Sequence, residues 1–171
     1  MHPGAAPPAG FSPRHAGGAS PSRPDQGVTT TMTNERTSPA QYPRQSATLT
    51  SEAVSVPVAR QIVREACAEW GMDQDAAETG TLLISEIVTN AVRHGHSHSV
   101  RVIAEQPRPD RLRVAVVDKS CRVPELHIVG PDAIGGRGLL LVDALSDRWG
   151  TDLLPWGKRV WAEIAIKVGD R

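Results

Sequence analysis

LISEIVTNAVRHG, residues 83–95, is the stretch that decides the fold. Its apolar residues recur at helical spacing, which predicts the end of an amphipathic helix. Glu86 and Asn90 are four residues apart, so their side chains share one face of that helix. An Asn oxygen is a hard ligand suited to magnesium, and a nearby Glu is suited to orient or deprotonate an attacking hydroxyl. A polar stripe on a solvated helix surface would look the same, so the stretch needs support from elsewhere in the chain.

Two helices are expected in this part of the chain. Apolar residues recur at helical spacing over residues 56–70, with Ser55 as the expected N-cap and Gly71 as the stop. The second helix is expected to begin near Asp73, to run to about residue 93 and to end at Gly95. It therefore contains the stretch that carries Glu86 and Asn90.

Alternation with a period of two predicts strands around these helices. Strands are expected at residues 46–50, 100–104, 112–116, 148–154 and 158–168. The second and third form a hairpin around a Pro-Arg-Pro-Asp turn, with Asp118 at the end of the later strand, and an apolar helix is expected over residues 139–146. The pattern predicts an α/β (α+β) fold, a two-layer sandwich in which about three helices cover one face of a mixed, mainly antiparallel sheet.

Composition divides the chain into a tail and a domain. Eight of the 14 prolines lie within the first 43 residues, where large apolar residues are nearly absent. Such a segment buries too little apolar surface to offset the loss of chain entropy. Residues 1–42 are therefore expected to be a disordered tail, and residues 43–171 a single folded domain.

The charge and cysteine content of the chain restrict its expected cellular location and its expected partners. Lysine plus arginine number 19, as do aspartate plus glutamate, and the zero net charge argues against a direct nucleic-acid partner. Cys67 and Cys121 form no CxxC pair, which favours a reducing cytoplasm. No apolar run reaches the roughly 18 residues that a membrane span needs. We expect a cytoplasmic protein with no membrane partner.

Two more features suit a nucleotide. A carboxylate at the bottom of a pocket, such as Asp118, can accept a hydrogen bond from the exocyclic amine of adenine. The glycine cluster at residues 135–138 precedes a helix, where backbone N–H groups and the helix dipole favour phosphate. Alone, such a cluster is typical of a flexible turn, and a lone Asp is unspecific. Together with Glu86 and Asn90, these features predict binding of ATP with Mg²⁺, which neutralises phosphate charge.

The order of these motifs resembles a known superfamily. The matching motifs are Glu86-x-x-x-Asn90-Ala-x-x-His94-Gly95, Val-Val-Asp118 and Gly136-x-Gly138-Leu139. They are similar to those of the gyrase, chaperone and histidine-kinase type ATPases. Within that superfamily the chain resembles the bacterial anti-sigma-factor serine kinases and the small ATP-binding regulators of actinomycetes, whose Asp-Arg-Trp-Gly and Gly-Lys-x-Val-Trp endings recur at residues 147–150 and 157–161. The resemblance covers about residues 44–168 and implies the Bergerat-type ATP-binding fold.

The resemblance also implies roles for individual residues. Glu86 would be the catalytic base or would position water, Asn90 would bind Mg²⁺, Asp118 would read adenine, and residues 119–135 would form a lid. The implied nucleotide-binding set is Asn90, Arg93, His94, Asp118, Ser120, Gly135, Gly136, Arg137, Gly138 and Leu139. Family members of this type form dimers, bind a sigma factor and phosphorylate a serine on a small antagonist protein. A sigma factor, an antagonist and a second copy of the chain are therefore the expected partners.

Three positions depart from the family pattern. The usual Asp-x-Gly reads Asp118-Lys119-Ser120 here. Ile134 stands where studied kinases carry an Arg that faces the terminal phosphate, which makes Arg137 the candidate to replace it. The late Thr that supports the adenine pocket corresponds to Arg159. The motifs therefore favour ATP binding more strongly than phosphoryl transfer.

The leading hypothesis is an anti-sigma factor with serine/threonine protein kinase activity that regulates transcription. One alternative is a non-catalytic module that uses ATP only to order its partner surface. Another is the detached ATPase domain of a histidine kinase, although the N-terminal region offers no helical hairpin with a phosphoacceptor His.

Overall fold

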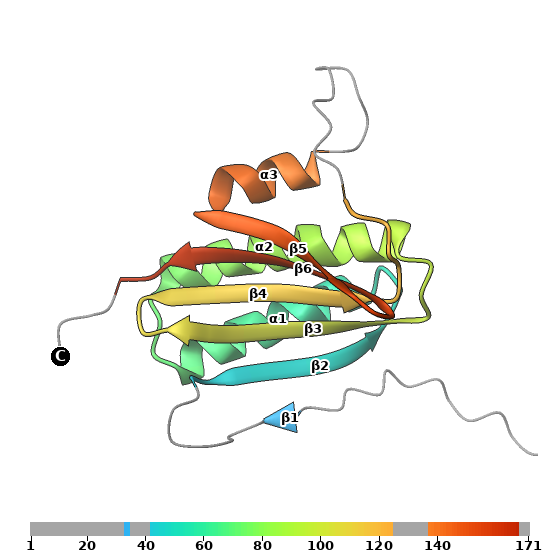
Figure 1. Ribbon diagram of the computed structural model, residues 1–171. Helices are drawn as coiled ribbons and strands as arrows, with labels where there is room; N and C mark the ends of the chain where they lie inside the picture. The colour runs from blue at the N-terminus through green and yellow to red at the C-terminus, as the bar shows by residue number, and fades with distance from the viewer. Residues whose placement is uncertain (1–32, 35–41, 125–136, 168–171) are drawn as a thin grey trace, which may run out of the picture.

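A computed structural model describes residues 33–34, 42–124 and 137–167 of the chain. Within these ranges three helices accompany a six-stranded sheet of order β1-β2-β3-β4-β6-β5 (Figure 1). The strands are β1 Thr33–Asn34, β2 Arg44–Thr50, β3 Ser99–Arg108, β4 Arg111–Asp118, β5 Arg148–Leu154 and β6 Gly157–Ala165. The helices are α1 Ser55–Glu69, α2 Gln74–His94 and α3 Gly138–Leu145. The predicted α/β fold is confirmed, but every strand pair among the described residues is antiparallel, so the sheet is not mixed.

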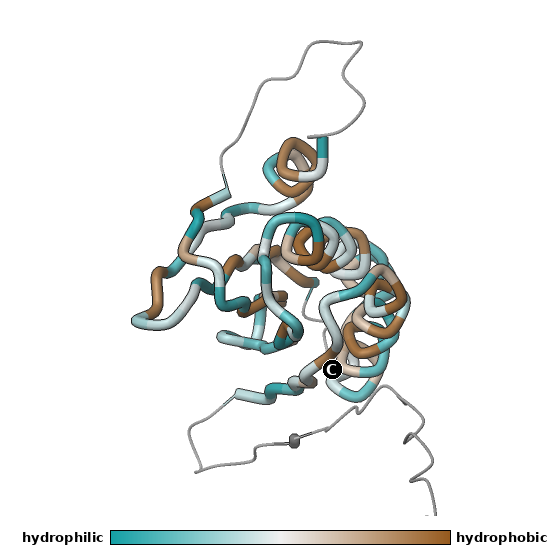
Figure 2. Tube along the Cα trace, turned by 90° about the vertical axis from the view of Figure 1, so that its right-hand side faces the viewer, coloured by the Kyte–Doolittle hydropathy of each residue, from teal (hydrophilic) through white to brown (hydrophobic). Residues whose placement is uncertain are grey.

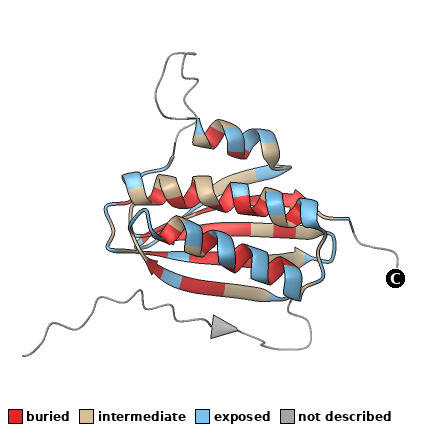
Figure 3. Cartoon of the chain, turned by 180° about the vertical axis from the view of Figure 1, so that it is seen from behind, coloured by how far each residue is buried: buried red, intermediate tan, exposed pale blue. Residues whose placement is uncertain are grey.

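The helices α1 and α2 lie side by side across one face of the sheet (Figure 3). The side view in Figure 2 shows this pair and the sheet as two layers, with α3 set apart at one edge. Each long helix turns an apolar stripe to the sheet, such as Ile62 and Val63 of α1 and Leu83 and Ile87 of α2, all fully buried. These stripes meet the inward side chains of β3, β4 and β6 in one core. The third helix packs on α2 and β5, so it extends the helical layer beyond the β5 edge.

The helix ends follow the local sequence with one exception. Gly71 adopts a φ of 67°, the left-handed conformation that stops α1, and the Asp73 carboxylate accepts from the Ala76 N–H at 2.7 Å to cap α2. Ser55, the expected cap of α1, is not the N-cap. The helix begins at Ser55 itself, and its buried hydroxyl donates to the Thr50 carbonyl at 2.6 Å, which ties the helix to the end of β2.

Strand pairing places the end of β4 beside the beginning of β6. The predicted hairpin is confirmed, with Val102 opposite Val116 in β3 and β4. The other edge of β4 pairs with β6, so Asp118 lies opposite Lys158. The last strand ends at Ala165, before the expected residue 168, which lies outside the described residues. Residues that are 40 positions apart in sequence therefore become neighbours at this end of the sheet.

The segment predicted to be a disordered tail contributes two residues to the sheet. Thr33–Asn34 form β1, which pairs with β2, so β2 is not an edge strand. The rest of residues 1–41 lies outside the described residues.

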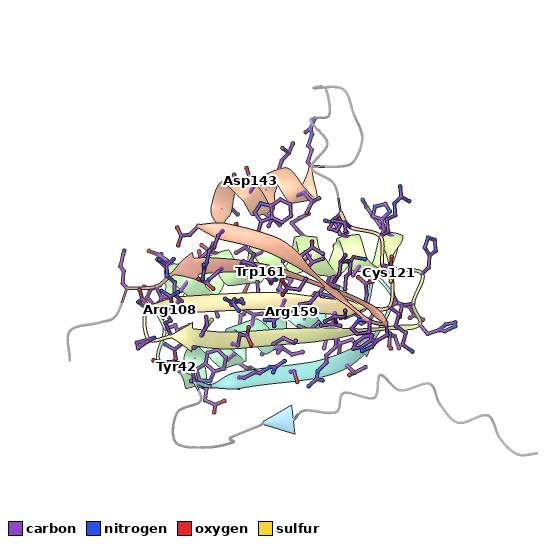
Figure 4. All side chains as sticks on the ribbon, in the orientation of Figure 1. Tyr42, Arg108, Cys121, Asp143, Arg159 and Trp161 are labelled. Atoms are coloured by element: carbon purple, nitrogen blue, oxygen red, sulfur yellow. The ribbon has the colours of Figure 1, made fainter. Side chains whose placement is uncertain are left out.

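The face of the sheet that the helices leave open is turned to the viewer in Figure 1. It carries a row of alternating charges. Directly opposite residues on five adjacent strands form this charge ladder, in the order Arg44, Glu105, Arg113, Glu163 and Arg148. Glu163 is 1% exposed, and Arg113 and Arg148 bind its two carboxylate oxygens at 2.7 and 2.8 Å. The guanidinium groups of Arg113 and Arg148 lie 5.0 and 6.0 Å from the ring centre of Trp161, labelled in Figure 4. The ladder thus covers the open face with opposite charges that pair across neighbouring strands.

Replacing Glu163 with Gln tests the stabilising role of the ladder. Burial alone would raise the pKa of Glu163, but the hydrogen bonds and charges of Arg113 and Arg148 outweigh burial and lower that pKa below its ordinary value. We expect Glu163→Gln to lower the free energy of unfolding at pH 7 by about 1–3 kcal/mol, since it removes the charge that accepts the hydrogen bonds of both Arg113 and Arg148. Urea unfolding measures this difference.

The pH dependence has a definite sign. A carboxyl whose folded-state pKa is lowered stabilises the fold above its unfolded-state pKa and loses this effect as pH falls through the folded-state value. The stability difference between the original chain and Glu163→Gln should therefore be constant near neutrality and shrink as pH falls below about 4. Asp110→Asn at an exposed turn is the control, with little change expected. A difference that grows towards acidic pH would contradict the account.

Candidate functional site

A cavity of about 170 Å³ lies between the C-terminal half of α2, the end of β4, the beginning of β6 and the beginning of α3. One water molecule needs only roughly 10–15 Å³ of such volume, so this cavity can hold a larger ligand. Its lining residues are Ile87, Asn90, Ala91, His94, Val116, Asp118, Arg122, Val123, Pro124, Leu139, Lys158 and Val160. The walls are mainly apolar and carry a few polar groups, which is typical of a small-molecule site.

Asp118 is the buried acidic group of the cavity. Its side chain is 1% exposed because β4 ends between α2 and β6. One carboxylate oxygen, Oδ1, accepts from the Ser120 N–H at 2.7 Å and from Lys158 Nζ at 3.0 Å. The other oxygen, Oδ2, is buried and has no hydrogen-bond partner within the described ranges. A buried oxygen without a donor is costly, so Oδ2 is suited to accept from a ligand.

Two glycines let the chain pass close to Asp118. A Cβ at position 157 would lie 2.1 Å from the Asp118 carbonyl oxygen. A Cβ at position 95 would lie 2.3 Å from the Ala91 carbonyl oxygen and 3.5 Å from Asp118 Cγ. Both contacts involve backbone that cannot move away, so glycine is required at each position.

The beginning of α3 meets Glu86 and Asn90 of α2. A Cβ at position 138 would lie 2.6 Å from Glu86 Oε2 and 3.6 Å from Asn90 Nδ2. The predicted carboxylate, carboxamide and glycine are therefore neighbours, although 52 positions separate Glu86 from Gly138 in sequence (138 minus 86). Because α3 begins at Gly138, the free N–H groups of a helix N-terminus lie at the same place.

The other predicted site residues are distributed unevenly around this centre. His94, at the end of α2, and the buried Leu139 line the cavity, and Ser120 donates its N–H to Asp118. Arg93 and Arg137 are exposed and do not line it. Gly135 and Gly136, together with most of the predicted lid, lie outside the described residues.

The sequence interpretation missed Lys158 and assigned its place to Arg159. The Arg159 side chain lies on the open face, where it binds Glu105 (Figure 4), whereas Lys158 points into the cavity and reaches Asp118. The signal was available in the alternation of β6. Lys158 precedes Val160 and Ala162 by steps of two, so it shares their inward face.

The arrangement fits a purine nucleotide with its metal ion. The apolar wall residues suit a flat base, Asp118 Oδ2 suits an amine donor, and the α3 N-terminus suits phosphate. No group of three or more His, Cys, Asp or Glu side chains that could hold a metal occurs in the part of the chain that the structure describes. Magnesium commonly uses one or two protein oxygens and completes its coordination with phosphates and waters. The Asn90 carboxamide oxygen is therefore the ligand that fits.

Comparison with known proteins agrees with this geometry. Residues 49–163 match the histidine kinase-like ATPase domain family. The chain belongs to this family. The match spans the two long helices, the cavity and α3, so the ATPase family and the candidate site occupy the same part of the chain.

One solved structure supports the fold. The RsbU and RsbW domains of Rv1364c from Mycobacterium tuberculosis match with a TM-score of 0.56 and 24% sequence identity. The match covers 72% of this chain and 32% of that chain, so this protein spans about a third of its structural relative. A search of curated protein sequences gives no match. No helix in the described ranges has the length and apolar character to cross a membrane.

Replacing Asp118 with Asn tests the cavity as a nucleotide site. We expect Asp118→Asn to weaken ATP binding at least about tenfold, because a charged acceptor becomes a neutral amide. Isothermal titration calorimetry with Mg²⁺ present measures the affinity, and thermal unfolding without nucleotide verifies the fold. Asp152→Asn, at an exposed position of β5, is the control and should bind as the original chain does. Equal affinity in Asp118→Asn would exclude Asp118 from the site.

Proposed function

We propose that this ATPase-family protein is an anti-sigma factor that phosphorylates a serine or threonine of a small antagonist protein. The observation that carries the proposal is the meeting of Glu86, Asn90 and the α3 N-terminus beside the cavity that Asp118 closes. Phosphoryl transfer needs positioned phosphates and a group that orients or deprotonates the attacking hydroxyl. The chain offers a candidate for each task. The sequence motifs of the anti-sigma-factor kinases and the fold shared with part of the RsbU and RsbW structure favour this branch of the family.

Each residue has a physical role in this proposal. Glu86 would accept the proton of the serine hydroxyl as it attacks the terminal phosphate. The N–H groups at Gly138 would bind phosphate oxygens. Magnesium, when bound at Asn90, would neutralise phosphate charge. Arg137 lies next to Gly138, where a guanidinium group can stabilise the charge that develops on the transferred phosphate.

The proposed partners follow from the same branch of the family. A sigma factor would be the client, and the unphosphorylated antagonist would release it by binding the protein in its place. A second copy of the chain would complete a homodimer. This mode of transcription regulation places the protein in the cytoplasm.

Glu86→Gln tests the catalytic part of the proposal. We expect it to lower transfer from ATP to the antagonist serine at least about 100-fold while ATP affinity stays within about twofold, because a neutral amide cannot accept the proton. Incubation with radiolabelled ATP, magnesium and purified antagonists measures transfer, and calorimetry measures binding. Glu78→Gln, on an exposed position of the same helix, is the control and should transfer at the original rate.

The outcomes separate the competing functions. Transfer to no antagonist, with nucleotide and sigma-factor binding intact, would favour the non-catalytic module, which the Ile134 departure supports. That module also predicts that Glu86→Gln releases the sigma factor as the original chain does. An acid-labile product would instead indicate phosphohistidine, and with it the histidine-kinase alternative. An acid-stable product that depends on Glu86 is the result that the proposal expects.

A further inference from the structure

Lys158 is the cavity residue whose presence the family roles leave unexplained. It is 5% exposed, and its ammonium group donates to Asp118 Oδ1 at 3.0 Å and to the Ser120 carbonyl at 3.3 Å. Taking an ammonium group out of water is costly, and the pairing with Asp118 offsets that cost, since either charge alone would be buried and uncompensated. The alternation of β6 would be satisfied equally well by an apolar residue at position 158, as at positions 160 and 162. Because an apolar residue at position 158 would leave Asp118 unpaired, Lys158 balances that charge, and its place in the cavity wall also brings it next to a ligand.

The two oxygens of the Asp118 carboxylate differ in their hydrogen-bond partners. Oδ1 already accepts two bonds, one from Lys158 Nζ and one from the Ser120 N–H. Oδ2 accepts none from the described residues. An ammonium group has three protons, and the described acceptors use two of them. Among the described residues, this buried pair therefore keeps one acceptor and one donor without a partner.

We propose that Lys158 is a second base-reading residue, which donates a hydrogen bond to the ring nitrogen N1 of adenine while Asp118 Oδ2 accepts from the neighbouring amine. Adenine carries this acceptor and this donor on adjacent atoms of one edge. Guanine carries the opposite order at the same positions, an oxygen in place of the amine and an N–H in place of the free ring nitrogen. The pair thus selects adenine by two complementary bonds. The inference rests on the proposed nucleotide site and adds a specificity-determining residue to it.

A simpler role for Lys158 makes a different prediction. If the lysine only balances the charge of Asp118, then its removal lowers the affinity for every nucleotide that contacts Asp118 by the same factor. If the lysine reads N1, then its removal weakens the binding of ATP more than the binding of a nucleotide that lacks N1. The comparison of two nucleotides with two proteins therefore separates the roles.

The experiment titrates ATP, GTP and 1-deaza-ATP, in which a C–H group replaces N1, into the full chain and into Lys158→Met, with Mg²⁺ present. The full chain should bind 1-deaza-ATP at least about tenfold more weakly than ATP, and GTP more weakly still, because a charged donor loses its acceptor. Lys158→Met should bind ATP at least about tenfold more weakly and should bind 1-deaza-ATP as well as it binds ATP. Lys167→Met, exposed beyond β6, is the control and should match the full chain.

The contrary outcomes are distinct. Equal binding of ATP and 1-deaza-ATP by the full chain would overturn the inference without touching the proposed function. An equal loss of affinity for ATP and for 1-deaza-ATP in Lys158→Met would also overturn the inference, because the lysine would then act only through Asp118. Tighter binding of GTP than ATP would reverse the assigned base. Absence of any ATP binding by the full chain would overturn the nucleotide site itself, and this inference with it. Thermal unfolding without nucleotide verifies the fold of Lys158→Met, and Lys158→Leu provides the same comparison if that variant does not fold.

Discussion

The buried carboxylate of Asp118 constrains the organisation of this protein more than any other group. A carboxylate with 1% exposure can remain in the fold only if donors surround it, and the chain supplies two from opposite directions, the Ser120 N–H and Lys158 Nζ. The first fixes the turn after β4, and the second requires that β6 pair with β4 in the observed register. Gly157 is then needed because the chain passes the Asp118 carbonyl oxygen too closely for a side chain. One acidic residue thus links the turn after β4 to the beginning of β6.

The buried acids on the two faces of the sheet differ in how many of their carboxylate oxygens have hydrogen-bond partners. On the open face, Arg113 and Arg148 bind both carboxylate oxygens of Glu163, so this residue has no capacity left for a ligand. On the helical side, Asp118 keeps one buried oxygen without a partner in the described part of the chain. An unsatisfied buried group costs roughly 1–3 kcal/mol, which a ligand donor recovers on binding. This difference supports a stabilising role for Glu163 and the proposed ligand-binding role of Asp118.

Much of this could be predicted from the sequence, for physical reasons that also explain the errors. The long helix with Glu86 and Asn90 and the β3–β4 hairpin are encoded by local periodicity, and both were predicted within a few residues. Lys158 was not identified, because its partner lies 40 positions earlier and the pairing exists only once β6 has aligned with β4. The charge ladder was missed for the same reason, since single charges at alternate positions of separate strands read as a solvated face. Ser55 was interpreted as a helix cap because local sequence does not show that the Thr50 carbonyl would accept its hydroxyl proton.

A crystal structure of the protein with magnesium and a non-hydrolysable ATP analogue tests the central claim most directly. The account predicts that the adenine amine lies within hydrogen-bond distance of Asp118 Oδ2, with the phosphates at the beginning of α3 beside Glu86 and Asn90. A nucleotide that binds with its base away from Asp118, or outside this cavity altogether, would contradict the account.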